Sequence, residues 1–387
     1  MRWQEEIPSF LRGLIRNFSP SGQEEGVADL ILEKMEELGF DEVTRDRMGN
    51  VVGKISGGEG APIIFDGHMD VAEVGDLNNW HVDPFSGVSL DGRIYGRGSV
   101  DMKGGLASMI YGCASAEPSV DLYVVCVVHE ETYEGVALRE VLKEVGRRPR
   151  AVVLGEPTDL NLSVGQRGRC VLKVVTRGKT AHASMPELGR NAIYRMIPIL
   201  RKIEVENRRL PTHPLLGKGT MAVTDIRAMP GGPIIPDRCE ITVDRRMIIG
   251  EDREGILEEV RGLAPEAEVE VVKEELLCYT GYRMEVESYF PPWLLGEDHP
   301  LVRCSLEALK GALGSEPEVT VWRFSTDGVT SAGVLGIPTI GFGPGDPSMA
   351  HQPDEWVGEK EVILAARGYK ALAESLSEVS NPTPMNG

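Results

Sequence analysis

Four short apolar runs in this sequence each lead into a residue that can bind a metal ion. The runs and the polar residues that follow them are Phe65 with His68, Val128 with Glu131, Leu154 with Glu156, and a strand expected at 338–342 with His351. The runs are β-branched and continuous, which is typical of strands buried on both faces. Ligand sites of open α/β sheets form at the carboxyl ends of the strands. The pattern therefore predicts an α/β fold in which these four side chains meet in one crevice.

A fifth candidate ligand, Asp101, precedes a helix predicted at 104–115, and small residues in that helix favour close packing on the sheet. Two histidines and three carboxylates match a hydrolytic site for two metal ions with nitrogen and oxygen ligands. Asp101 is the best candidate to bridge the ions. Asp70 lies two residues after His68 and is placed to hold the imidazole from behind.

Composition narrows the classes of function. A chain of 387 residues favours two or three domains, and 41% apolar residues suffice for their cores. The net charge of −19 argues against nucleic acid and anionic membranes as partners, and otherwise indicates solubility. No apolar run is long enough to span a membrane, and from the acidic first residues we expect no secretory signal. Its six cysteines are scattered without a Cys-x-x-Cys pair, so we expect reduced thiols in a cytoplasmic protein.

A segment with a different order of predicted strands and helices interrupts the predicted α/β domain. Between residues 167 and 281, strands and helices alternate in the order β-α-β-β-α-β, with predicted elements at 169–176, 188–204, 219–228, 234–248, 251–263 and 267–277. This order is typical of a small α+β sandwich. We expect an inserted lid or dimerisation domain at 167–281. The catalytic domain, with a mixed sheet, would then be discontinuous, comprising 1–166 and 282–387.

Several motifs occur in order along nearly the whole chain: GHMD, DPF, YGRGSVDMKGG, HEE, GEPT, GKTAHASMPELGRNAI, DRR, STDG and AHQPDE. Together they resemble the zinc-dependent peptidase and deacylase family of acetylornithine deacetylase, succinyl-diaminopimelate desuccinylase, aminoacylase and glutamate carboxypeptidase. Stretches such as GQRGRC and ITVDRRMIIGE look closest to a branch of selenium-metabolism-linked hydrolases. Desuccinylases carry an asparagine where this chain reads PGGPIIP at 230–236, which weakens the case for their substrate.

The resemblance implies a metal-dependent amidohydrolase that cleaves an N-acyl amino acid or a small peptide. It implies two zinc ions per subunit, with cobalt or manganese as substitutes. His68 and Glu156 would bind one ion, Glu131 and His351 the other, and Asp101 both. Asp70 would orient His68, and Glu130 would be the general base. The family also implies a homodimer in which His182 of the lid reaches the neighbouring subunit's site.

Other readings of these residues stay open. Arg246 could clamp a substrate carboxylate, or it and Arg245 could be charges on a sheet face. Thr326 and Gly343 could line the substrate pocket or form a plain turn, and His182 could be a solvated histidine before a helix. The remaining histidines are expected to be structural: His81, His129, His213 and His299. Two rival functions are a metal-binding interaction protein without hydrolytic activity and a dinuclear hydrolase of another bond, such as a phosphoester.

Overall fold

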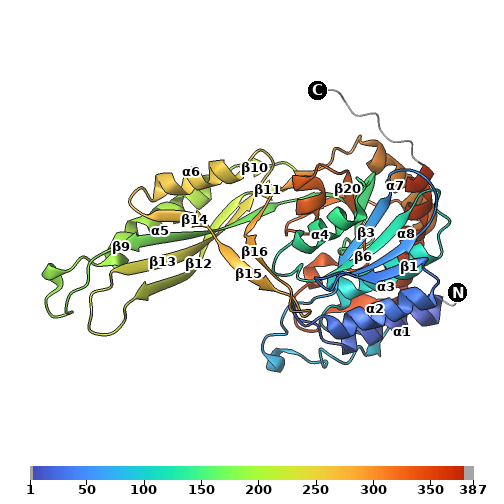
Figure 1. Ribbon diagram of the computed structural model, residues 1–387, viewed down its shortest axis with the longest axis horizontal. Helices are drawn as coiled ribbons and strands as arrows, with labels where there is room; N and C mark the ends of the chain where they lie inside the picture. The colour runs from blue at the N-terminus through green and yellow to red at the C-terminus, as the bar shows by residue number, and fades with distance from the viewer. Residues whose placement is uncertain (1–2, 379–387) are drawn as a thin grey trace.

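A computed structural model describes residues 3–378 as two bodies, each with its own sheet and apolar core (Figure 1). Residues 1–2 and 379–387, which the prediction assigns to the catalytic domain, lie outside the described residues. The first body holds a nine-stranded mixed sheet in the order β1-β2-β6-β3-β7-β20-β8-β18, with β19 beside β8. Its strands are β1 (Glu42–Arg45), β2 (Val51–Ile55), β3 (Ile63–His68), β6 (Leu122–Val127), β7 (Ala151–Leu154), β8 (Leu162–Gln166), β18 (Trp293–Leu294), β19 (Val319–Trp322) and β20 (Thr339–Gly341).

The central strands of this sheet are parallel and buried. β6, β3, β7 and β20 pair in parallel, whereas β1, β2 and β18 add antiparallel strands at the edges. Helices cover both faces, as a parallel sheet requires. The helices of the first body are α1 (Trp3–Arg16), α2 (Glu25–Glu37), α3 (Gly104–Ala114), α4 (Val136–Val145), α7 (Pro300–Leu313) and α8 (Glu359–Glu378).

The second body is an antiparallel sheet with two helices. Its strands lie in the order β12-β13-β9-β14, with β17 also beside β9, and they are β9 (Gly168–Arg177), β12 (Thr220–Met229), β13 (Arg238–Met247), β14 (Glu268–Val271) and β17 (Tyr289–Phe290). The helices are α5 (Ala192–Arg209) and α6 (Arg253–Leu263). The element order β9-α5-β12-β13-α6-β14 is the predicted one. The fold class, a mixed-sheet α/β body with an α+β sandwich, is confirmed.

Smaller elements complete the chain. Short strands form β4 (Ser89–Leu90) with β5 (Arg93–Tyr95) and β21 (Trp356–Gly358), β10 (Thr212–His213) with β11 (Gly217–Lys218), and β15 (Lys273–Leu277) with β16 (Arg283–Glu287). Short helical segments are η1 (Leu77–Asn79), η2 (Ser99–Lys103), η3 (Pro186–Leu188), η4 (Val329–Val334) and η5 (Pro347–Met349). No helix of residues 3–378 is both long and apolar enough to cross a membrane.

The prediction of a single strand at 267–277 is wrong, because this segment contains two strands that belong to different sheets. β14 pairs with β9 of the second sheet, and β15 pairs with β16 in a separate hairpin. The change of partner falls at Val272, whose N–H donates to the Val171 carbonyl oxygen of β9 and whose carbonyl oxygen accepts from the Ser288 N–H beyond β16. Residue 281, the expected end of the inserted domain, lies in the turn of this hairpin, and β17 returns to the second sheet beyond it. The domain boundaries stay a prediction.

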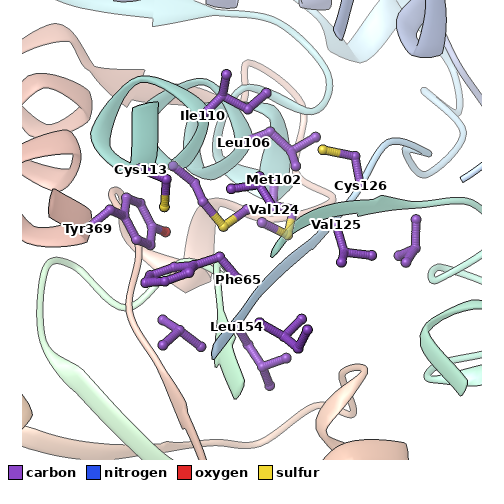
Figure 2. Packing of buried hydrophobic residues seen from close by; sticks show 14 of the residues in the cluster. Phe65, Met102, Leu106, Ile110, Cys113, Val124, Val125, Cys126, Leu154 and Tyr369 are labelled. Carbon is purple, nitrogen blue, oxygen red and sulfur yellow. The ribbon is translucent and has the colours of Figure 1, made fainter. Parts of the chain in front are cut away.

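The core of the first body lies between the sheet and the pair α3 and α8. Figure 2 shows Phe65 and Leu154 from the strands below Leu106 and Ile110 of α3, with Tyr369 of α8 beside Phe65. The Tyr369 ring meets the Phe65 ring edge to face, with centroids 6.2 Å apart. The two helices approach closely because Gly112 has no side chain: a Cβ there would lie 2.4 Å from the Ala366 carbonyl oxygen. The predicted small-residue helix thus packs on a helix as well as on the sheet.

Substitution of Gly112 by alanine tests this close approach. The added methyl group would force α3 and α8 apart, and we expect a loss of about 1–3 kcal/mol in the free energy of unfolding. Gly13→Ala in α1 is the matched control, because no atom lies within 4 Å of its added Cβ. It should be neutral or stabilising by about 0.5–1 kcal/mol. Urea unfolding followed by circular dichroism measures both, and equal stability of the two variants would contradict the packing argument.

Candidate active site

Asp101 lies between two histidines at the carboxyl edge of the first sheet. Its Oδ1 is 3.0 Å from Nε2 of His68, and its Oδ2 is 3.2 Å from Nε2 of His351. Asp101 and His68 are buried, whereas His351 is more than half exposed. One carboxylate thus faces two imidazoles with its two oxygens, which is the arrangement required of a residue that bridges two ions.

A further carboxylate stands beside each histidine. Glu156 Oε1 lies 3.6 Å from His68 Nε2, and Glu131 Oε2 lies 3.0 Å from His351 Nε2. In each of the two groups, His68–Asp101–Glu156 and Asp101–Glu131–His351, the possible ligand atoms lie within 4.8 Å of one another. The structure therefore brings together all five side chains predicted as ligands, in the two sets that the sequence analysis expects.

The fold delivers these side chains from strand ends and one anchored loop. His68 ends β3, Glu131 and Glu156 follow β6 and β7 closely, and Asp101 lies in η2. Met102, the residue after Asp101, is buried (Figure 2), and it has room because Gly67 of β3 and Gly155, which follows β7, have no side chains. A Cβ on Gly67 or Gly155 would lie 2.4 or 2.6 Å from the Met102 methyl carbon. The core thus fixes the backbone that carries Asp101.

A buried ion pair supports the same loop from the opposite side. Glu355 Oε1 accepts hydrogen bonds from the backbone N–H groups of Val100 and Asp101, at 3.0 and 3.2 Å. Its other oxygen pairs with Arg97, which also donates to the His351 carbonyl oxygen at 3.3 Å. The pair therefore ties two predicted ligands together. Sequence reasoning missed it, although Arg97 and Glu355 lie in the YGRGSVD and AHQPDE motifs.

Asp70 makes a different set of contacts from the one expected. Its main-chain oxygen, not its carboxylate, accepts from Nδ1 of His68 at 2.8 Å, and the nearest carboxylate oxygen is 3.7 Å away. The carboxylate instead accepts the N–H groups of Glu130 and Glu131, each at 3.1 Å, and the Ser21 hydroxyl at 2.7 Å. Asp70 thereby fixes the His68 tautomer through its backbone and holds the two glutamates through its side chain.

Burial and charge shift the pKa values of these groups in opposite directions. Burial raises the pKa of Glu130 and Glu156 well above the usual range, and also that of Glu131. Burial alone would lower the pKa of His68, but hydrogen bonding to Asp101 and the charges of nearby carboxylates raise it well above the usual value. Hydrogen bonds to Asp101 and Glu131 raise the pKa of His351 to about 10. So many buried carboxylates need compensating positive charge.

The donor set fits divalent zinc. Nδ1–H of His68 donates to the Asp70 carbonyl oxygen, so the lone pair of the neutral ring is on Nε2, which points at Asp101. Imidazole nitrogens and carboxylate oxygens are the ligand types that zinc, cobalt and manganese accept, and no thiolate is among these side chains. Divalent cations would supply the compensating charge that protons on the two rings otherwise provide.

A pocket of about 330 Å³ opens beside the five side chains, between the two bodies. Glu130 and Arg246 line it, as expected for a base and a substrate-binding residue, whereas Arg245 is buried on Glu251 and Glu259. Two further charged residues line this pocket and were not predicted: Glu134 and Arg169. Glu134 lies three residues after Glu131, and Arg169 lies within the GQRGRC motif, so their place in the sequence was the available signal.

Thr326, Gly343 and His182 have contacts other than the expected ones. Thr326 is buried and donates to Gln166, and Gly343 is buried with its N–H on Thr158; neither lines the pocket. His182 is exposed, and its Nδ1 lies 2.7 Å from the Ser184 hydroxyl. It belongs to the loop after β9, at the end of the second body that is remote from the first sheet (Figure 1). The structure does not bring His182 to the cluster of its own chain.

The four histidines expected to be structural have structural contacts. Nε2 of His129 lies 3.0 Å from the Leu277 carbonyl oxygen, which links the turn after β6 to the β15–β16 hairpin. His81 pairs with Asp354 at 2.6 Å. His213 and His299 accept backbone N–H groups through Nδ1, and His299 thereby caps α7. The His129 contact gives a physical reason for histidine at the first position of His-Glu-Glu.

Comparison with known proteins decides the family. A family model described as peptidase family M20/M25/M40 matches residues 64–375, most of the chain. The chain belongs to this family. The predicted resemblance to zinc-dependent peptidases and deacylases is thereby confirmed, and family membership supports a metal-dependent hydrolase of amide bonds.

Similar proteins match this chain over nearly their whole length. The protein YgeY of Escherichia coli (strain K12) is 38% identical over 381 residues, covering 96% of this chain and 94% of YgeY. A succinyl-diaminopimelate desuccinylase of Rhodospirillum centenum is 29% identical, covering 94% and 95%. The M20 metallo-carboxypeptidase Sso-CP2 from Sulfolobus solfataricus superimposes with a TM-score of 0.73 at 18% identity, covering 97% and 100%. Bacillus subtilis YXEP, a dinuclear metal binding peptidase, gives 0.69 at 17%, covering 96% and 97%.

Metal affinity of this M20 family protein should rise with pH. A metal ligand histidine must be neutral, and the pKa of His351 is raised to about 10, so protons compete with the metal at neutral pH and below. We expect zinc affinity to increase steadily from pH about 6 to about 9, with release of protons on binding. Calorimetry in buffers of different ionisation enthalpy measures both quantities. Affinity that is constant over this range, without proton release, would contradict the assignment of these histidines.

Proposed function

We propose that this protein is a zinc-dependent amidohydrolase that removes an acyl group or an amino acid from an N-acyl amino acid or small peptide. The observation that carries the proposal is Asp101, whose two oxygens face His68 and His351 beside a pocket that Asp101 and Glu130 both line. His68 and Glu156 would hold one ion, Glu131 and His351 the other, and Asp101 both. Two bound ions would activate a water molecule and polarise the substrate carbonyl.

Glu130 is proposed as the general base. Its Oε2 lies 4.0 Å from His68 Nε2, and its buried Oε1 has no hydrogen-bond partner among residues 3–378. A carboxylate with an uncommitted oxygen beside the ligands can accept the proton of the attacking water and pass it to the departing amine. Burial raises its pKa, which makes it a stronger base than an exposed glutamate.

Arg246 is proposed to bind the substrate carboxylate. It projects from β13 into the pocket, and its Nε and Nη2 are held by Asp244 at 2.8 and 3.3 Å. The remaining N–H groups of a guanidinium so held are pre-oriented for a second carboxylate. This contact would place the scissile amide between the arginine and the histidines.

Replacement of Glu130 and Glu131 tests the proposal. The metal-loaded wild type should hydrolyse members of a panel of N-acyl amino acids and dipeptides but not phosphoesters, and a chelator should abolish turnover. Glu130→Gln should keep two ions by elemental analysis and lose about 100-fold or more of kcat with little change in KM.

Glu131→Gln is the matched control, since the same change in the neighbouring residue should lower metal content. If Glu130→Gln loses metal and Glu131→Gln does not, their roles are exchanged. Turnover by metal-free wild type, or activity confined to phosphoesters, would overturn the proposed function.

We also propose a homodimer in which His182 acts on the partner's site. β12 is an edge strand of the second sheet, and edges invite pairing with another copy. Large apolar side chains are exposed on β12 and α5: Ile226, Met229, Ile193, Tyr194 and Ile197. Two-fold pairing along this edge would bury them and extend the sheet across both chains. His182 would then stabilise the negative oxygen that develops during attack on the carbonyl.

Subunit exchange tests the shared site. Inactive Glu130→Ala and inactive His182→Ala chains are mixed, and exchange is verified by mass tagging. Half the dimers are then mixed, and in each of these one site has both an intact base and the partner's intact histidine. We expect about a quarter of wild-type activity to return. Activity that stays at the level of the separate variants after verified exchange would rule out the shared site.

A further inference from the structure

The turn that carries Glu130 and Glu131 begins with a residue in an unusual backbone conformation. His129 has a φ of 59°, in the left-handed region that residues other than glycine rarely adopt. Two buried carboxylates hold the amides of this turn: Glu24 accepts the N–H of His129 at 3.3 Å, and Asp70 accepts those of the next two residues. Backbone strain at a functional site persists where surrounding contacts over-determine it. The side chain of His129 is the remaining group that can hold this conformation.

The imidazole of His129 is buried and binds a different part of the fold from its backbone. Its Nε2 lies 3.0 Å from the carbonyl oxygen of Leu277. A carbonyl oxygen can only accept, so Nε2 carries the proton and donates it. Gly22 leaves space for this contact, because a Cβ there would lie 3.3 Å from the same oxygen and 3.6 Å from the ring. One hydrogen bond thus joins the residue before the proposed base to strand β15.

The β15–β16 hairpin spans the two bodies (Figure 1). The chain leaves the second sheet after β14, forms the hairpin, and returns to that sheet at β17. Three apolar side chains of the hairpin lie in the core of the first body: Leu276, Cys278 and Val286. At its tip, the Tyr279 hydroxyl donates to the Gly49 carbonyl oxygen, before β2, at 2.8 Å. The hairpin is therefore anchored to the second sheet by the strands that flank it and to the first body by its tip and its apolar face.

These contacts connect the two parts of the proposed active site. The first body carries Glu130, and β13 of the second body carries Arg246, which is proposed to bind the substrate carboxylate. β13 pairs with β9, and β9 also pairs with β14 and β17 on either side of the hairpin. A continuous path of contacts therefore runs from the arginine through β9 and the hairpin to the His129 ring. A rotation of one body relative to the other would act on this hydrogen bond, one residue away from the base.

We propose that His129 is a positioning residue that couples the second body to the base Glu130 through the β15–β16 hairpin. The inference rests on the proposed amidohydrolase function and adds to it a contact outside the pocket, which His129 does not line. The hydrogen bond to Leu277 holds the left-handed turn against the hairpin. The Glu130 carboxylate then stays aligned with a substrate that the second body holds.

Two substitutions of His129 separate the hydrogen bond from the backbone conformation. The amide nitrogen of glutamine reaches the position of Nε2 and can donate to Leu277, whereas that of asparagine reaches only the position of Nδ1. Asparagine, however, is enriched in the left-handed conformation. We expect His129→Asn to keep two ions by elemental analysis and to lose about 10- to 100-fold of kcat with little change in KM.

The conservative variant His129→Gln should keep most of the wild-type kcat, because it retains the donor to Leu277. An asparagine variant as active as the glutamine variant, or more active, would overturn the inference. The backbone conformation at this position, and not the bond to the hairpin, would then determine the rate.

The hairpin is also tested from its tip. Tyr279→Ala removes the anchor on Gly49 and should lower kcat in the same manner as His129→Asn. The two changes combined should lower kcat no further than the larger single change, because they break one path. Glu275→Gln is the control, since its ion pair with Arg283 lies within the hairpin, and it should behave as wild type. Wild-type kcat in Tyr279→Ala, or losses that multiply in the combined variant, would contradict the coupling.

Hydrogen–deuterium exchange measures the coupling without requiring turnover. On the zinc-loaded protein, His129→Asn should speed exchange of the backbone amides of residues 129–131 by about tenfold or more. His129→Gln should leave their exchange as in the wild type. Unchanged exchange in His129→Asn would show that the hairpin does not hold this turn, and the inference would fail.

These measurements separate the inference from the proposed function. If the wild type hydrolyses amides and the two His129 variants are equally active, the coupling is wrong and the amidohydrolase function stands. If the wild type cleaves no amide but exchange is faster in His129→Asn alone, the proposed function is wrong and the coupling of the hairpin to the turn stands.

Discussion

The buried carboxylate of Asp101 is the constraint on which the rest of the structure depends. A charge in this position must be paired on each side, and His68 and His351 meet its two oxygens at 3.0 and 3.2 Å. His68 ends a central strand, and His351 lies 283 residues later in the chain. The sheet therefore has to bring distant segments to one edge. Parallel strands do this because their carboxyl ends lie together.

Two kinds of interaction hold the loop that carries Asp101: apolar packing and hydrogen bonding. Below it, Met102 fills a slot between Gly67 and Gly155, so apolar packing fixes the loop. Beside it, Glu355 accepts two backbone N–H groups, one from Asp101 itself, and Arg97 neutralises Glu355. Packing sets the position of the loop, and hydrogen bonds set its orientation. A side chain that is proposed to bridge two metal ions needs both.

The second body contributes to the pocket without contributing a predicted ligand. Its strands β9 and β13 carry Arg169 and Arg246. Glu134 of the first body lies opposite them and contacts Arg169. The charges of the pocket are thus divided between the bodies. Carboxylates and histidines of the first body suit cations, and the guanidiniums of the second suit a substrate carboxylate. This division is consistent with the proposed hydrolysis of an amide that carries a carboxylate.

Much of the fold and of the candidate site followed from the sequence. Apolar β-branched runs predicted the central strands and periodicity predicted the helices, because each signal is local. The helix predicted at 104–115 is α3 (Gly104–Ala114), and the strand predicted at 338–342 is β20 (Thr339–Gly341). The five side chains expected as ligands lie together because each follows a strand or precedes a helix whose place in the sheet is topologically fixed.

Tertiary structure decided what depends on contacts between segments far apart in the chain. The bend at Val272 divides a predicted strand, because alternation of apolar residues carries no information about which sheet each half joins. Thr326 and Gly343 pack behind the pocket instead of lining it. The contact of Arg169 with Glu134 and that of Arg97 with Glu355 join residues separated by 35 and 258 positions.

The sequence by itself determined which elements form and which side chains stand at their ends. Only the folded chain decided which buried charges meet, because pairing across such separations depends on packing of the whole chain and not on local pattern.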